Sequence, residues 1–207
     1  RGFVGRRDQG AGADGISGDE RRRRTPPGQY LTDGFPVLSA GPTPRTSLER
    51  WSLRVEGLVG RPVEWSWEEF LALPARDYVV DISCVTKWTH LDMRWRGVSV
   101  DTLLEAVELE PSAAFVVAYS DGGYTTNLPF ADIVNNQAFV AFEYDGKPLA
   151  PEHGGPARLV VPGRYFWKSA KWIRGLRILD HDEPGFWESL GYNNRGDQWL
   201  EERYSGD

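Results

Sequence analysis

From about residue 50 onward, hydrophobic and polar residues follow the spacings of regular secondary structure. Apolar and polar residues alternate over 50–57, which predicts a half-buried strand. Runs of apolar and β-branched residues predict buried strands over 78–83 and 114–120. Helical spacing predicts short helices over 66–74 and 99–109, and Ser66 with Glu69 forms a capping-box pattern at the start of the first helix.

The second half of the sequence is rich in predicted strands. A strand–turn–strand unit is predicted over 119–129, and a hairpin with Asp-Gly at its turn over 137–150. Two more strands are predicted over 157–163 and 171–180. No internal repeat and no break in composition follows residue 50, so the pattern predicts a single α+β domain with several short helices.

The N-terminal segment lacks this patterning. Residues 1–28 are rich in Gly, Arg and Asp and have almost no apolar periodicity, which predicts a disordered arm and leaves 29–207 as the folded domain. The apolar, Pro/Gly-rich segment 35–44 is expected to lie extended on the domain surface, and the aromatic tail 183–204 is expected to wrap the domain.

Composition narrows the possible functions. The net charge of −6 argues against a nucleic-acid-binding protein, because phosphate neutralisation needs a basic surface. No apolar run approaches the ~20 residues of a membrane span. Four arginines at 21–24 are not followed by an apolar stretch, so they are no export signal, and a cytoplasmic location is expected. Nine Trp, eight Tyr and nine Phe residues suit the walls of a deep pocket as well as a core.

Cys84 is the only cysteine in the chain, which excludes an intramolecular disulfide and any Cys-rich metal site. It stands at the end of the predicted strand 78–83 and precedes Lys87, a cation of the kind that favours the thiolate form. Residue type alone leaves three interpretations open: a small buried hydrophobe, a nucleophile paired with a histidine, or a metal ligand.

Residues 152–172 gather basic and imidazole groups around two glycines and a predicted strand. The cationic groups of this cluster are His153, Arg158, Arg164, Lys168 and Lys171. Such a cluster is either a solvated strand edge or a site that grips a phosphorylated aromatic cofactor by charge-assisted hydrogen bonds. No dinucleotide fingerprint and no P-loop is present.

Together these segments resemble the sulfite oxidase family of molybdopterin-dependent oxidoreductases, most closely its small, stand-alone bacterial members. The motifs that carry the resemblance are "CVTKWT" (84–89), "WRGV" (95–98), "SDGGYTTNLP" (120–129), "HGGPARLVVPGRYFWKSAKW" (153–172) and "PGFWE" (184–188). The resemblance implies a sulfite-oxidase-type catalytic domain of mixed sheets and short helices, without the Ig-like dimerisation domain.

The resemblance also implies roles for individual residues. Cys84 corresponds to the thiolate ligand of molybdenum in a molybdenum–molybdopterin cofactor. Tyr124 and Lys87 are the expected catalytic residues that face the substrate. The residues expected to hold the pterin or its phosphate are Ser120, His153, Arg158, Ser169, Ala170 and Lys171.

The implied activity is two-electron, oxygen-atom-transfer chemistry on a small molecule, with sulfite or a sulfoxide as first candidates and a separate electron carrier such as a haem protein. One departure from the family pattern weakens the case for sulfite as the substrate. Animal and plant sulfite oxidases carry an arginine that helps to hold the anion, where this chain has Leu38, Ser39 and Ala40. The alternatives are a non-redox binding module that keeps the fold and a Cys-dependent hydrolase.

Overall fold

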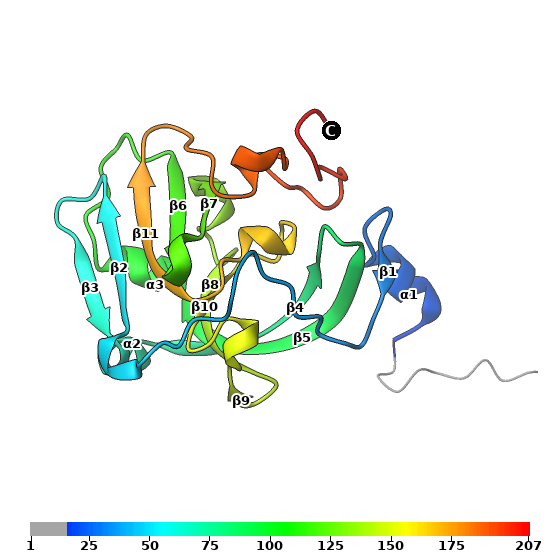
Figure 1. Cartoon of the computed structure of the whole chain (residues 1–207), viewed down its shortest axis with the longest axis horizontal. Helices are drawn as coiled ribbons and strands as arrows, with labels where there is room; N and C mark the ends of the chain where they lie inside the picture. Colours follow the sequence, from blue (N-terminus) through cyan, green and yellow to red (C-terminus); the bar gives the residue numbers. More distant parts are fainter. Residues whose placement is uncertain (1–15) are drawn as a thin grey trace, which may run out of the picture.

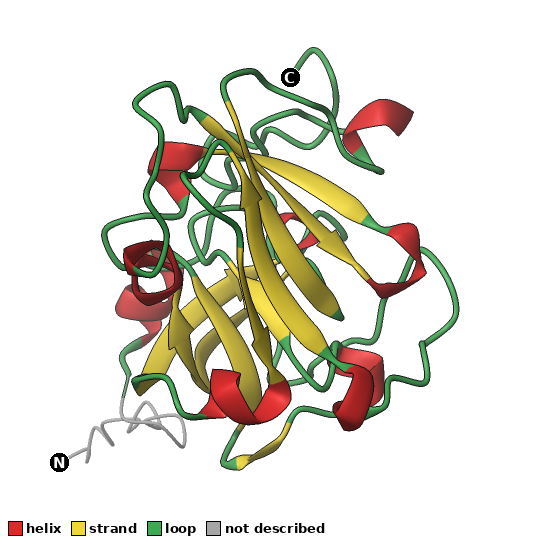
Figure 2. Cartoon of the chain, turned by 90° about the vertical axis from the view of Figure 1, so that its left-hand side faces the viewer, coloured by secondary structure: helices red, strands yellow, loops and turns green. Residues whose placement is uncertain are grey.

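The structure, a computed structural model, describes residues 16–207 and consists of two β-sheets with short helices at their edges (Figure 1, Figure 2). The helices are α1 (Gly18–Arg23), α2 (Trp67–Leu71), α3 (Val100–Glu105) and the 3₁₀ helices η1 (Leu48–Arg50), η2 (Asp121–Gly123), η3 (Phe130–Asp132), η4 (Pro151–His153), η5 (Phe166–Lys168) and η6 (Glu188–Leu190). The mixed sheets and short helices confirm the predicted α+β class. Within residues 16–207, no helix has the length and apolarity needed to cross a membrane.

The six-stranded sheet is organised around β5. Its strands are β1 (Tyr30–Leu31), β4 (Ala75–Ser83), β5 (Trp88–Ser99), β8 (Phe139–Tyr144), β9 (Lys147–Pro148) and β10 (Arg158–Val160). Antiparallel β4 follows β5 along one side, while parallel β1 and antiparallel β8 pair with its two ends on the other side. The sequence pattern predicted β4, but it missed β5 because charged residues such as Asp92 and Arg94 interrupt its apolar positions. Pairing with β4 is what defines this strand.

The five-stranded sheet has the order β3-β2-β11-β6-β7. Its strands are β2 (Ser52–Gly57), β3 (Val63–Ser66), β6 (Phe115–Ser120), β7 (Thr125–Pro129) and β11 (Ile173–Leu179). Central β11 runs parallel to β2 and antiparallel to β6, so the last strand in the sequence lies in the middle of the sheet, between two strands that precede it. The larger hydrophobic core packs on this sheet and includes the fully buried Leu53, Phe70, Leu128 and Leu176.

Two local predictions agree closely with the structure. The Ser66 hydroxyl accepts a hydrogen bond from the Glu69 amide at 3.3 Å, and the Glu69 carboxylate accepts one from the Ser66 amide at 2.8 Å, which completes the capping box of α2. Asp145 and Gly146 both have positive φ at the hairpin between β8 and β9. This is the backbone that a two-residue Asp-Gly turn requires.

The predicted disordered arm needs correction. Residues 1–15 lie outside the described part of the chain, but Gly18–Arg23 form α1, which Ser17 caps. Arg24 then donates bidentate hydrogen bonds to the carboxylate of Asp81 in β4, at 2.6 and 2.9 Å, and contacts Asp92 in β5. These charge-assisted bonds attach residues 18–28 to the six-stranded sheet. Sequence patterning missed them because the partners lie 57 and 68 positions away.

Candidate functional site

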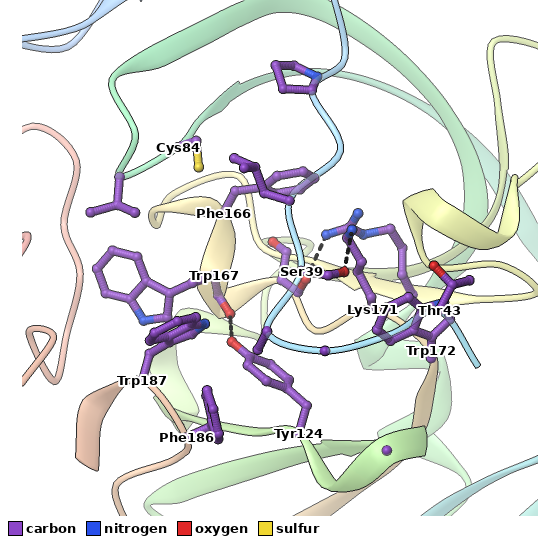
Figure 3. Close-up of a pocket in the computed structure, with 18 of the residues that line it drawn as sticks. Ser39, Thr43, Cys84, Tyr124, Phe166, Trp167, Lys171, Trp172, Phe186 and Trp187 are labelled. Carbon is purple, nitrogen blue, oxygen red and sulfur yellow. Dashed lines mark hydrogen bonds between the residues drawn. The ribbon is translucent and has the colours of Figure 1, made fainter. Parts of the chain in front are cut away.

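A cavity of about 640 Å³ lies where the two sheets meet the irregular segments (Figure 3). Four regions line it: the extended segment 35–44, the turn after β4, the turn after β6, and the chain between 158 and 192. The close-up shows Cys84, Trp167 and Trp187 on one side of the cavity and Lys171 and Trp172 on the other. This volume is within the range of roughly 300–1,000 Å³ found for small-molecule and cofactor pockets.

Cys84 enters the cavity from a tight turn that joins β4 to β5. Its amide donates to the carbonyl of Trp88 at 2.9 Å, and its carbonyl accepts from the amide of Lys87 at 2.9 Å. The Thr86 hydroxyl donates to Sγ at 3.2 Å. Burial raises the pKa of the thiol, whereas the Thr86 hydrogen bond and the positive charge of Arg158 act in the opposite direction. A cationic or metallic partner is therefore needed to favour the thiolate.

Arg158 is a buried cation without a carboxylate partner among residues 16–207. Its guanidinium donates to the carbonyls of His153 and Ser169, both at 2.7 Å, and lies 4.1 Å from the centre of the Phe166 ring. Burial lowers its pKa well below its ordinary value, to about 9. Because an uncompensated buried charge is costly, this arginine favours an anion in the cavity that it lines.

Lys171 supplies the second cation of the cavity. Its ammonium donates to the carbonyl of Glu152 at 2.7 Å and to the hydroxyl of Ser39 at 3.2 Å. Burial, with a smaller contribution from the nearby positive charge of Arg158, lowers its pKa to about 8. The Ser39 contact ties the extended segment 35–44 to the wall of the cavity.

Ser169 and Tyr124 complete the predicted residues that line the cavity. The Ser169 hydroxyl accepts from the amide of Val161 at 2.9 Å, while its carbonyl orients Arg158. The Tyr124 hydroxyl donates to the carbonyl of Trp167. Burial raises the pKa of Tyr124 well above its ordinary value, so its phenol stays protonated and holds Trp167 in place.

Four predicted residues do not line the cavity. Lys87 is exposed in the turn, with φ of 74°, and its backbone is engaged on both sides: its amide donates to the carbonyl of Cys84 at 2.9 Å, and its carbonyl accepts from the amide of Tyr30 at 2.8 Å. Ala170 is buried in the core, and Ser120 is buried at the end of β6 with an unpartnered hydroxyl. His153 stacks on Phe35 with ring centres 3.8 Å apart, and its carbonyl, not its ring, supports Arg158.

Sequence patterning underestimated the segment 35–44. It lies extended and mostly exposed, as expected, and in addition Phe35, Ser39 and Pro42 line the cavity. The available signal for a cavity wall was the combination of apolar side chains with Pro and Gly. Such a segment does not form a helix or strand of its own, so its apolar side chains have to pack against the rest of the domain. Trp167, Trp172 and Trp187 also line the cavity; they stand in the motifs that carry the resemblance, but no individual role was predicted for them.

The donor set of the cavity limits how a metal can bind. Among residues 16–207, no group of three or more His, Cys, Asp and Glu side chains is arranged to hold a metal ion. Cys84 alone offers a soft sulfur ligand, and two cations lie in the same cavity. A metal bound here would have to bring most of its ligands with it, on an anionic carrier.

Comparison with known proteins agrees with this geometry. The family model "Oxidoreductase molybdopterin binding domain" matches residues 40–187. The uncharacterized oxidoreductase YuiH of Bacillus subtilis is 42% identical over 185 residues, which cover 89% of this chain and 93% of that protein.

More distant similarities extend to larger proteins. The catalytic subunit MsrP of the Gluconobacter oxydans protein-methionine-sulfoxide reductase is 29% identical over 70% of this chain, which spans about half (52%) of MsrP. Among solved structures, the sulfane dehydrogenase SoxCD of Paracoccus pantotrophus superposes with a TM-score of 0.64 at 20% identity, over 96% of this chain and 62% of that one. The last match establishes a shared fold.

Proposed function

The chain belongs to the oxidoreductase family defined by the molybdopterin-binding domain, and from this premise we propose that the cavity binds a molybdenum–molybdopterin cofactor with Cys84 as the protein ligand of the metal. The observation that carries the proposal is the presence, in a single aromatic-walled cavity, of one soft thiol and two cations that have no carboxylate partner among residues 16–207. A phosphorylated cofactor that carries its own metal ligands satisfies each of these features.

Arg158 and Lys171 are the residues proposed to hold the anionic part of the cofactor. Both already donate to backbone carbonyls that fix their direction, and each has N–H groups left over for a ligand. An anion would relieve the electrostatic cost of burying Arg158 and would raise the pKa of Lys171 from about 8. Ser169 contributes by orienting Arg158.

When bound, the cofactor supplies two-electron, oxygen-atom-transfer chemistry. The protein's part is to provide and shape the site. Cys84 must release its thiol proton, which the positive charge of Arg158 favours. Phe166, Trp167 and Trp187 give the cavity apolar walls, and the Tyr124 hydrogen bond fixes Trp167.

The substrate proposed first is a sulfoxide, with sulfite as the second candidate. Arg158 and Lys171 are the only Lys or Arg side chains among the described residues that line the cavity, and both are assigned to the cofactor. Lys87, expected beside the substrate, lies outside. Sulfite is an anion and would lack a cation of its own, whereas a neutral sulfoxide suits the apolar surroundings of Cys84. Reduction of the sulfoxide to the sulfide and water consumes two protons and two electrons. The two electrons are proposed to come, one at a time, from a separate carrier such as a haem protein, and the protons come from the solvent.

The two alternatives have less support. A Cys-dependent hydrolase needs a histidine near Cys84, and none of the three histidines lines the cavity. His90 contacts the carbonyl of Gly34 and His181 contacts Asp180, both at exposed positions. A non-redox binding module gives no reason for a cysteine at this position beside a buried arginine.

The test is metal and pterin analysis of protein purified from a host that makes the cofactor. We expect about one molybdenum per chain, with pterin fluorescence after acid release. Arg158→Met should lose both, while Arg177→Met, which removes an exposed arginine of β11, should lose neither. Cys84→Ser should retain much of the pterin and lose turnover. A wild-type protein without molybdenum and pterin, or a fully active Cys84→Ser variant, would contradict the proposal.

A further inference from the structure

Gln29, immediately before β1, contacts the turn that carries Cys84. Its side-chain amide nitrogen donates to the carbonyl of Cys84 at 3.1 Å and to that of Trp88 at 3.0 Å. The same nitrogen lies 3.4 Å from the hydroxyl of Thr89. A single side chain therefore spans both ends of the turn between β4 and β5.

The C-terminal tail holds Gln29 in this orientation. Arg203, which is 8% exposed, donates to the Gln29 side-chain oxygen at 3.0 Å and to the carbonyl of Pro27 at 3.3 Å. Its own charge is paired with Glu201 at 2.8 Å. Because the oxygen of the Gln29 amide is occupied by a donor, its nitrogen must face the two carbonyls of the turn.

The backbone next to Gln29 supports the same turn. The amide of Tyr30 donates to the carbonyl of Lys87 at 2.8 Å, and that of Thr32 donates to the carbonyl of Thr89 at 3.0 Å. Inside the turn the hydrogen bonds are all short-range: the backbone bonds between Cys84, Lys87 and Trp88, and the bond from the Thr86 hydroxyl to Sγ of Cys84. The segment 29–32 is therefore an external clamp on the turn, with Gln29 as its side-chain part.

We propose that Gln29 is a positioning residue that fixes where the Cys84 thiol enters the cavity, and that Arg203 orients Gln29 for this purpose. The proposal rests on the proposed function for its significance, since a rigid ligand matters to a metal site. Removing supporting hydrogen bonds around metal ligands typically reduces metal affinity by about 10–100-fold. The position of the thiol is set by contacts within the chain and does not require a bound cofactor.

The test uses the full-length protein without cofactor. Cys84 is the only cysteine, so the rate of alkylation by iodoacetamide at one fixed pH reports this thiol and no other. In Gln29→Ala, the turn loses the amide that spans it, and alkylation should accelerate about tenfold, as expected for the loss of one to two hydrogen bonds. Hydrogen exchange should accelerate at the amides of Cys84 and Lys87 and remain unchanged in β11.

Two variants distinguish positioning from general support. Gln198→Ala removes another side-chain amide in the tail, one that donates to the carbonyl of Pro162 at 3.2 Å, and it should leave alkylation at the wild-type rate. Gln29→Glu keeps an acceptor for Arg203, and therefore the contact between residues 29 and 203, but it loses both hydrogen bonds donated to the turn. It should react as fast as Gln29→Ala, and it remains informative where the alanine variant does not fold.

Wild-type alkylation rates in both Gln29 variants would overturn the proposal, as would equal acceleration in Gln198→Ala. Because these rates are measured without cofactor, they are independent of whether the protein binds molybdenum. A protein without molybdenum but with accelerated Gln29 variants would refute the proposed function and leave the positioning intact. The reverse combination would refute the positioning alone.

Discussion

Replacing Glu188 with alanine removes the carboxylate that pairs with the buried ammonium of Lys168. The two side chains are 2.7 Å apart and are 1% and 0% exposed, respectively. The same carboxylate oxygen also accepts from the indole of Trp167 at 2.9 Å and from the hydroxyl of Thr126 at 2.8 Å. This interaction attaches the C-terminal tail to the wall of the cavity.

The expected loss of stability in Glu188→Ala follows from these contacts. Breaking a buried ion pair by removing one partner destabilises a protein by roughly 3–5 kcal/mol. The Lys168 ammonium would keep the carbonyls of Asn127 and Asn194, at 2.7 Å each, which places the loss near the lower end. We expect the free energy of unfolding to fall by about 3 kcal/mol, which lowers the Tm by about 6–12 °C in a chain of this size.

The assay is urea denaturation at two pH values. Burial already lowers the pKa of Lys168 below that of the unfolded chain, and the variant loses the carboxylate that opposes this shift. Between the folded and unfolded pKa values of Lys168, the unfolded chain binds more protons, so stability rises with pH. The deficit of Glu188→Ala relative to wild type should therefore be larger at pH 6 than at pH 9.5.

The matched control is the double variant Lys168→Met with Glu188→Leu. Replacing both members of a buried pair by apolar residues is often neutral or nearly so. The double variant should therefore be more stable than Glu188→Ala. A double variant that is less stable than the single one, or a deficit that does not depend on pH, would refute the assignment of the cost to an unpaired buried charge.

Three further outcomes are expected. Sulfate should stabilise the cofactor-free protein, by about 2.7 kcal/mol at one hundred times its Kd, and Arg158→Met should lose most of the resulting rise in Tm; an equal rise in both proteins would argue against an anion site at Arg158. Sulfate affinity, measured by calorimetry, should begin to fall as pH rises through about 8, because Lys171 there loses its proton; a flat profile from pH 7 to 8.5 would contradict this, and Lys171→Met supplies the flat control over that range, which lies below the pKa of about 9 of Arg158. Ser66→Ala should cost about 0.5–2 kcal/mol in urea denaturation through loss of the α2 cap, whereas Ser66→Thr should retain most of the stability; no loss in the alanine variant would contradict the role of the cap.

Sequence patterning was most successful where structure is local. The capping box at Ser66, the Asp145-Gly146 turn and the strand β4, which ends just before Cys84, each depend on neighbours within a few residues. The family resemblance, carried by short motifs, led to the right fold and family. The position of β5 escaped prediction, since its pairing with β4 overrides a mixed apolar and charged pattern.

The orientation of side chains in turns was also beyond the sequence. The family resemblance, which has a basic group just after the cysteine, implied that Lys87 lies beside the substrate, yet Lys87 is exposed and lies outside the cavity lining. Gln29 was not noticed at all, because its contact with the Cys84 turn joins residues 55 positions apart.

The basic cluster between 152 and 172 shows most clearly which features follow from the sequence and which depend on the tertiary structure. By itself the residue pattern determined that several cations stand near two glycines and a strand, and only the family resemblance, not the pattern, singled out Arg158 and Lys171 among them. The tertiary structure separates them: Arg164 pairs with Asp132 and Asp197, and Lys168 pairs with Glu188. Arg158 and Lys171 face the cavity, and neither has a carboxylate partner in the described part of the chain. Which cation remains available for a ligand depends on distant carboxylates that only folding brings into contact, because charge compensation acts through space and not along the chain.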